Sequence, residues 1–133
     1  MLVLVSLKSK YVPGCYYLDQ LDQYPEDLEN YVLKPLYSFA GSGVELNITK
    51  EMLDGLEDKE NYILQEKVNY VPVVDTPDVP AKCEIRMMAV YNTKEKKSTI
   101  VNNLMRLSKG EMVGVRYNQD KEWVGASVGF FEE

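Results

Sequence analysis

The proline-rich segment 71–81 (VPVVDTPDVPA) constrains the fold of this chain more than any other feature. It holds three of the six prolines, and proline can neither donate a backbone hydrogen bond nor continue a helix. We therefore interpret 71–81 as an extended linker between two small lobes, at 1–70 and 82–133. A chain of 133 residues has room for one domain or for two such lobes.

The composition excludes several classes of protein. Apolar residues make up 45% of the chain and charged residues 27%, as in soluble globular proteins. A net charge of −6 argues against binding of duplex nucleic acid, which needs a basic surface. The absence of histidine removes Ser-His-Asp and Cys-His catalysis and the usual zinc sites.

The sequence also predicts a compartment. Cys15 and Cys83 form no CxxC pair, which is typical of a reduced cytosolic protein. No signal peptide is recognisable at the start, and no run approaches the ~20 apolar residues of a membrane helix. We therefore expect a cytoplasmic protein that has neither nucleic acid nor membrane among its partners.

In the first lobe the residue pattern predicts strand, loop, strand, helix and strand. Residues 31–36 (YVLKPL) and 44–48 (VELNI) alternate as strands do, and a loop of mostly small residues, 37–43, lies between them. Thr49 is a good N-cap for a short helix, and 61–68 (NYILQEKV) is the next strand. An apolar run at 2–5 (LVLV) is interpreted either as a short buried strand or as a leader whose apolar side chains need a partner.

The second lobe is predicted to consist almost entirely of antiparallel strands. They are expected at 82–91, 99–107, 111–117 and 123–131, with a charged hairpin turn at 92–97 and a tight turn at 108–110. The alternative for the last segment is the start of a helix. The fold class predicted for the whole chain is therefore α+β.

One lysine, Lys34, lies inside an otherwise apolar strand. A buried ammonium group costs free energy unless an anion meets it. The loop behind this lysine supplies hydroxyl donors and also glycines, which let backbone N–H groups approach a ligand. These loop residues are Ser38, Gly41, Ser42 and Gly43. The pattern is typical of a concave anion-binding site.

The later strand of the first lobe ends in polar residues just before the linker. They are Gln65, Glu66 and Lys67, followed by Val68. Exposed backbone N–H and C=O groups at such a strand end suit the edge of an adenine ring, since one donor and one acceptor match its ring nitrogen and amino group.

The order of these segments resembles the ATP-grasp superfamily. YVLKPLYSFAGSGV (31–44) is similar to its lysine-bearing strand and glycine-rich phosphate loop, and YILQEKV (62–68) is similar to its hinge strand. CEIRMMAVY (83–91) and IVNNLMRLSKG (100–110) are similar to consecutive strands of its second subdomain. The resemblance covers roughly residues 31–125, most of the chain.

The resemblance implies an ATP-grasp-like fold that binds ATP and Mg²⁺ between two α+β subdomains. It also implies ligation of a small-molecule or peptide carboxylate to an amine or thiol through an acyl-phosphate. Lys34 would hold the α- and β-phosphates, 38–43 would cover the triphosphate and 65–68 would frame adenine. Arg86 and Arg106 would face the γ-phosphate or the carboxylate. The implied magnesium ligands are Glu84, Asn103 and Asn118.

Two departures from the family pattern put catalysis by this chain in question. The family usually places an acidic residue two positions before an asparagine on a late strand, whereas this chain has Arg116 two positions before Asn118. The 30 residues before Tyr31 are too few for the family's additional acceptor-binding domain. We therefore interpret the chain as the ATP-binding portion of a ligase that is incomplete or reduced.

Other interpretations of the same residues stay open. Lys34 is compatible with a strand lysine that extends to solvent, and Glu84 with Arg86 is compatible with a surface ion pair. A second class of function is a non-catalytic ATP-grasp-like module that self-assembles as a homo-oligomer, with exposed strand edges as its contact. A third is a small β-rich binding domain whose resemblance to the family is accidental.

Overall fold

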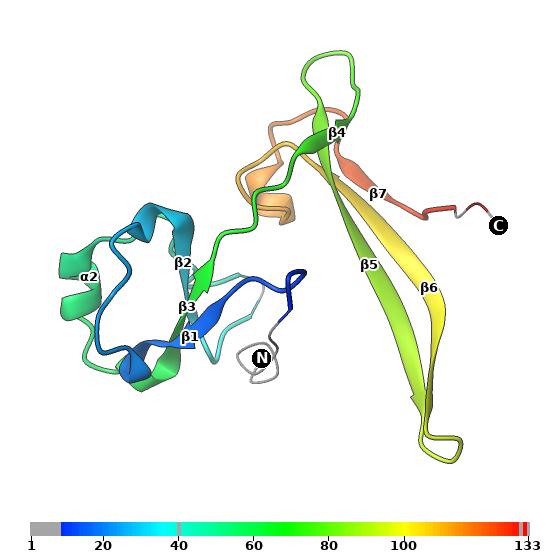
Figure 1. The fold of residues 1–133 in the computed structure, drawn as a ribbon. Helices are drawn as coiled ribbons and strands as arrows, with labels where there is room; N and C mark the ends of the chain where they lie inside the picture. The colour runs from blue at the N-terminus through cyan, green and yellow to red at the C-terminus, as the bar shows by residue number, and fades with distance from the viewer. Residues whose placement is uncertain (1–8, 40, 131, 133) are drawn as a thin grey trace. The chain divides into compact units, whose positions relative to one another are not determined.

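The computed structural model describes residues 9–39, 41–130 and 132 of the chain (Figure 1). The chain divides into two compact units, Met1–Asn69 and Tyr70–Glu133, called unit 1 and unit 2 here. Both units contain mainly antiparallel strands, and the helix content is small. The predicted strand at 2–5 lies outside the described residues. No helix among the described residues is long and apolar enough to cross a membrane.

Unit 1 is built on a three-stranded antiparallel sheet in the order β1-β3-β2. The strands are β1 (Cys15–Tyr17), β2 (Tyr31–Pro35) and β3 (Tyr62–Glu66). The connections contain the 3₁₀ helices η1 (Leu18–Gln20), η2 (Leu28–Asn30) and η3 (Lys59–Asn61), and the helix α2 (Lys50–Asp54). Thr49 caps α2, because its Oγ1 accepts a hydrogen bond from the Met52 amide at 3.2 Å.

The core of unit 1 lies on one face of this sheet. Leu33 of β2 and Leu64 of β3 are directly opposite in the register and both point into it. The buried side chains of the core are Leu18, Leu33, Ile48, Leu53 and Leu64. Because strand residues alternate between faces, Lys34 and Gln65 belong to the opposite face, with Val32 and Ile63.

The prediction of a strand at 44–48 is wrong in its extent. Only Glu45 pairs with β2, through an isolated bridge to Leu33 in which both N–H···O distances are 3.0 Å. Ile48 turns into the core, where it is 8% exposed, directly before the N-cap of α2. Burial of Ile48 and capping of the helix therefore replace further strand pairing.

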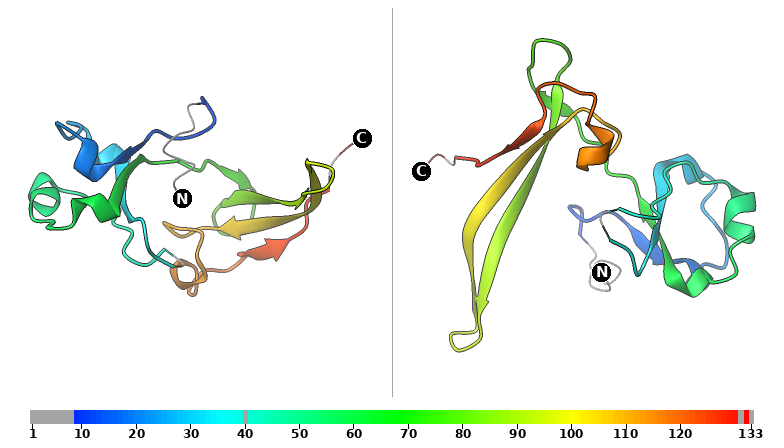
Figure 2. Two further views of the ribbon diagram at one scale, coloured as in Figure 1. Left: turned by 90° about the horizontal axis from the view of Figure 1, so that it is seen from below. Right: turned by 180° about the vertical axis from the view of Figure 1, so that it is seen from behind.

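Unit 2 is a single four-stranded antiparallel sheet in the order β4-β5-β6-β7 (Figure 1). The strands are β4 (Pro72–Val74), β5 (Ala81–Asn92), β6 (Lys97–Ser108) and β7 (Gly125–Ser127). The segment that the sequence predicts to be a linker thus contributes strand β4, where Pro72 occupies an edge position that needs no donor. The long β5–β6 hairpin reaches well beyond the short strands that flank it, which Figure 2 shows from two further sides.

The prediction of a strand at 111–117 is wrong. These residues form a loop that contains the 3₁₀ helix η4 (Val115–Tyr117). Gly110 lies so close to the chain that a Cβ there would be 2.2 Å from the Tyr117 carbonyl oxygen. Backbone groups of this loop form hydrogen bonds with the side chain of Asn118 instead of with a neighbouring strand, as described below.

Candidate functional site

The ammonium group of Lys34 is half-buried and meets an amide rather than a carboxylate. Lys34 lies opposite Ile63, and its Nζ donates to Gln65 Oε1 on the neighbouring strand at 3.0 Å. Among the described residues no carboxylate lies within ion-pair distance of it. Burial lowers the pKa of Lys34, while the nearby Cys15 thiol raises it to a smaller extent. The site therefore contains a cation with no counter-ion.

The glycine loop begins where β2 ends and returns beside it at Glu45. Gly41 and Gly43 have φ values of 76° and 70°, which only glycine adopts without strain. A Cβ at Gly43 would also be 2.8 Å from Pro35 Cγ. Ser38 and Ser42 are exposed. The loop thus places small residues and hydroxyl groups next to the strand that carries Lys34.

The strand end at 65–68 is held by backbone contacts on both sides. Glu66 donates its amide to the Gly14 carbonyl at 2.9 Å, and its carboxylate accepts the Gly14 amide at 2.8 Å. The Lys67 amide donates to the Asn30 carbonyl at 2.7 Å. The amide of Val68 has no partner among the described residues, and the Val68 side chain is 52% exposed. Val68 is thus the first residue past β3 whose N–H is open to a ligand.

A cavity of about 400 Å³ lies beside this strand end. It is lined by Ser9, Lys10, Tyr11, Val12, Pro13, Glu66, Lys67 and Val68. Two of these are lysines, and the Lys10 ammonium lies 4.9 Å from the centre of the Tyr11 ring. The wall formed by 11–13 was missed in the sequence analysis. The local sequence signal for this wall is the dipeptide Pro13-Gly14. In the structure, a Cβ at Gly14 would be 2.7 Å from Glu66 Oε1.

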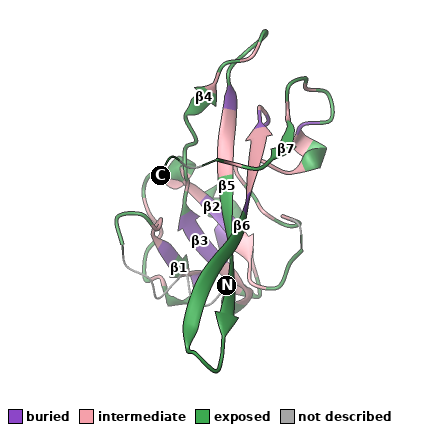
Figure 3. Ribbon diagram, turned by 90° about the vertical axis from the view of Figure 1, so that its right-hand side faces the viewer, coloured by how far each residue is buried: buried purple, intermediate pink, exposed green. Residues whose placement is uncertain are grey.

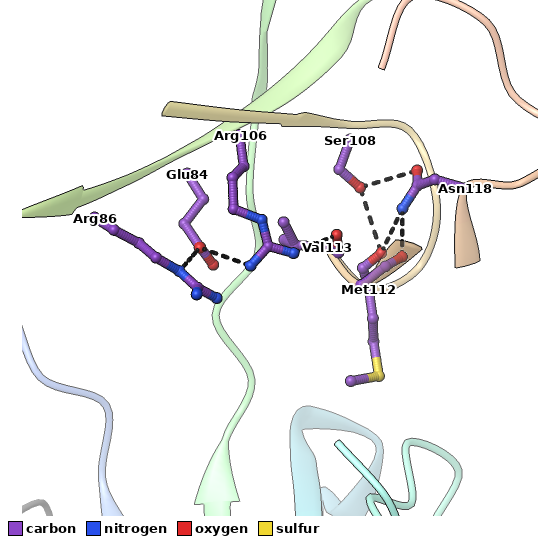
Figure 4. A network of polar contacts seen from close by, with 8 residues as sticks. Glu84, Arg86, Arg106, Ser108, Met112, Val113 and Asn118 are labelled. Carbon is purple, nitrogen blue, oxygen red and sulfur yellow. Dashed lines mark hydrogen bonds and ion pairs between the residues drawn. The ribbon is translucent and has the colours of Figure 1, made fainter. Parts of the chain in front are cut away.

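In unit 2 the two predicted arginines share one carboxylate (Figure 4). Glu84 Oε1 accepts from Arg86 Nε at 2.7 Å and lies 3.6 Å from Arg106 Nη1. Arg106 also donates to the Val113 carbonyl at 2.7 Å, which fixes its guanidinium. These three residues are therefore brought together on one face of the β5–β6 hairpin.

The structure does not bring the three predicted magnesium ligands together. Asn103 lies opposite Met87, on the other face from Glu84, and its amide makes reciprocal bonds of 3.0 and 2.6 Å with the Gly129 backbone. Asn118 lies in the loop after β6. Among the described residues no group of three or more histidine, cysteine, aspartate or glutamate side chains is arranged to hold a metal ion.

The Asn118 side chain is committed to the loop that contains it (Figure 4). Its Oδ1 accepts from Ser108 Oγ at 3.2 Å and from the amides of 109 and 110 at 3.0 and 2.8 Å. Its Nδ2 donates to the carbonyls of Met112 and Gly114, both at 3.0 Å. A carboxamide has two donors and one acceptor oxygen, so these five contacts use it fully.

The predicted site residues thus lie in separate units, and those of unit 1 occupy three different places in it. Unit 1 holds Lys34 with Gln65, the glycine loop, and Glu66, Lys67 and Val68 beside the cavity. Unit 2 holds Glu84, Arg86 and Arg106, and it has Asn103 and Asn118 in structural roles. Comparison with protein-family models, with curated proteins and with solved structures finds no match for this chain.

Proposed function

We propose that the chain is the ATP-binding portion of an ATP-grasp-type ligase that joins a carboxylate to an amine or thiol. The observation that carries this proposal is the half-buried Lys34 ammonium without a carboxylate partner, on the strand that leads into the glycine loop. Burial of this ammonium group costs free energy, and an anionic ligand bound to it would offset that cost.

The surroundings of Lys34 fit a nucleoside triphosphate. The glycine loop offers backbone and hydroxyl donors for phosphate oxygens, and the open Val68 amide offers a donor for an adenine ring nitrogen. A hollow of about 400 Å³ that is largely open to solvent lies beside Val68. Its two lysines add positive charge to a unit that is otherwise strongly acidic.

In the proposed reaction an oxygen of the acceptor carboxylate attacks the γ-phosphorus of ATP, and ADP leaves. The amine or thiol then attacks the acyl carbon, and inorganic phosphate leaves. Arg86 and Arg106 would stabilise the negative charge on the transferring phosphoryl group. Glu84 already accepts from Arg86, and this ion pair would have to open for the guanidinium to reach a phosphate.

Mg²⁺ is proposed as the cofactor, since it neutralises the phosphates during transfer. Glu84 is the carboxylate in unit 2 that is best placed to act as its ligand, as it lies beside both arginines. The oxygens of Asn103 and Asn118 would first have to give up their present hydrogen bonds. The donor set therefore fits magnesium only in part.

Calorimetric titration of the chain with ATP in the presence of Mg²⁺ tests the proposal. We expect Lys34→Ala to weaken binding at least about tenfold, because a charge-assisted hydrogen bond contributes roughly 1.5–3 kcal/mol. Lys50→Ala is the matched control, since Lys50 is exposed on α2, and it should bind like the native chain. Absence of binding at millimolar ATP, or equal loss in both variants, contradicts the proposal.

A second candidate is a non-catalytic module that assembles with copies of itself. The observation that favours it is the large exposed apolar surface of the β5–β6 hairpin. A module of this kind would keep the fold and show no Mg²⁺-dependent ATP binding, so the same titration separates the two functions.

A further inference from the structure

The two faces of the β5–β6 hairpin differ in chemistry. Residues directly opposite in the register share a face, and successive residues alternate between faces. One face carries the charged residues Glu84, Arg106, Arg86 and, near the turn, Lys97, interspersed with the apolar residues Met88, Val90 and Leu104. The other face is apolar and uncharged over most of its length. We call it the apolar hairpin face, and it contains Ile85, Met87, Ala89, Tyr91, Ile100 and Met105.

Most of this apolar hairpin face is open in the monomer, and it belongs to the outer part of the hairpin, whose residues are exposed (Figure 3). Ile85 is 53% exposed, Met87 46%, Tyr91 58% and Ile100 61%. These four side chains and the exposed Ala89 offer on the order of 500 Å² per copy, so two copies together would bury about 1,000 Å², near the lower end of stable interfaces.

The sheet of unit 2 has no apolar second layer of its own within the described residues. Its buried apolar side chain is Ala81, whereas its other buried side chains are polar. The flanking strands pair with the edges of the hairpin at one end only, since β4 pairs at Ala81 and Lys82 and β7 pairs at 105–107. At that end the backbone of Gly129 also lies against Asn103 and Met105 on the apolar hairpin face. A sheet with one apolar face normally buries that face against another layer.

The charge distribution favours a second copy of this chain as that layer. Unit 1 carries 6 Lys and 12 Asp+Glu, whereas unit 2 carries 9 Lys+Arg and 9 Asp+Glu. Two copies therefore repel through unit 1 and not through unit 2. In a twofold interface each face meets its own copy, so a face with no charge can pair without burying like charges. The opposite face would bring Lys97 and Arg86 against their own copies.

We propose that two copies of the chain form a twofold dimer by packing their apolar hairpin faces against each other. The contact is a face-to-face sheet packing, in which Ile85, Tyr91 and Ile100 supply most of the buried area. This dimer does not involve Lys34, so it is independent of ATP binding.

Light scattering coupled to size exclusion, over roughly 1–200 µM protein, measures the assembly. We expect a dimer of the native chain, and Ile100→Lys should raise the dissociation constant at least about thirtyfold, as for a central interface residue. Val90→Lys is the matched control. Val90 is an apolar residue, 58% exposed, on the opposite face of the same strand pair, and its variant should remain dimeric.

A native chain that stays monomeric over this range overturns the proposal. So does a series in which Val90→Lys dissociates as much as Ile100→Lys, or in which the native chain forms open-ended aggregates instead of a closed dimer. The Lys34→Ala variant should remain dimeric, so a failure of ATP binding and a failure of dimerisation are distinguishable.

Discussion

Lys34 illustrates how a single residue can cost stability at a candidate binding site. Its ammonium group is half-buried and donates to the neutral oxygen of Gln65, which compensates for lost hydration less than a carboxylate would. Groups of this kind are often kept for ligand binding rather than for stability. The same residue therefore links the energetics of folding to the proposed phosphate contact.

The lowered pKa of Lys34 has a consequence for stability at alkaline pH. Burial lowers its pKa in the folded state, so the unfolded chain binds more protons at pH values between the folded pKa and about 10.4. The contribution of Lys34 to the free energy of unfolding therefore increases as the pH rises through that window. We expect the unfolding free energy of the native chain, relative to Lys34→Met, to increase between pH 7.5 and 10 in urea titrations.

The control for this measurement is Lys50→Met, because Lys50 is exposed. Its difference from the native chain should stay flat over the same pH range. A flat profile for Lys34→Met would mean that this ammonium group is no less hydrated than a surface lysine.

At the scale of elements, the loop 109–118 depends on one carboxamide. Asn118 accepts three hydrogen bonds and donates two, and all but one of its partners are backbone groups of the loop itself. The close approach at Gly110 is possible only because that residue has no Cβ. Local side-chain to backbone bonds of this kind compete directly with strand pairing.

We expect Asn118→Ala to destabilise unit 2 by about 2–4 kcal/mol, since it leaves several enclosed backbone groups unpaired. Urea unfolding followed by the fluorescence of Trp123, the single tryptophan of the chain, reports this change. The neighbouring exposed Gln119→Ala should be nearly neutral. If Asn118 instead served mainly as a magnesium ligand, its variant would unfold like the native chain and lose only Mg²⁺-dependent nucleotide binding.

At the scale of the molecule, buried apolar surface is distributed unevenly. Unit 1 contains a cluster of five buried apolar residues, whereas unit 2 is a single sheet with its apolar hairpin face exposed. Net negative charge is also concentrated in unit 1. Burial against a second layer would therefore stabilise unit 2, and its equal numbers of positive and negative residues do not oppose the approach of another copy.

Hydrogen exchange should report this difference between the units. In the Ile100→Lys variant, which cannot bury the apolar hairpin face, we expect faster amide exchange in 87–100 than in the native chain. Amides of β3, which lie in the centre of the unit 1 sheet, should exchange equally slowly in both proteins. Equal exchange of 87–100 in the two proteins would show that nothing covers this segment in the native chain.

The sequence by itself determined the elements whose signals are local. Residue pattern predicted β2 and β3 close to their observed bounds, and Thr49 predicted the start of α2, because strand composition and N-capping depend only on neighbouring residues. It also indicated that Lys34 is an unusual member of its strand. The structure divides the chain at 69–70, before the proline-rich segment, and that segment belongs to unit 2.

Only the tertiary structure decided which residues meet. The contact of Lys34 with Gln65 depends on the register of β2 against β3, and the wall at 11–13 depends on how the chain before β1 returns to the strand end. The loop at 111–117 has strand composition, but Asn118 satisfies its backbone groups from outside that segment. Long-range hydrogen bonds and burial, which no local pattern contains, therefore override propensity there.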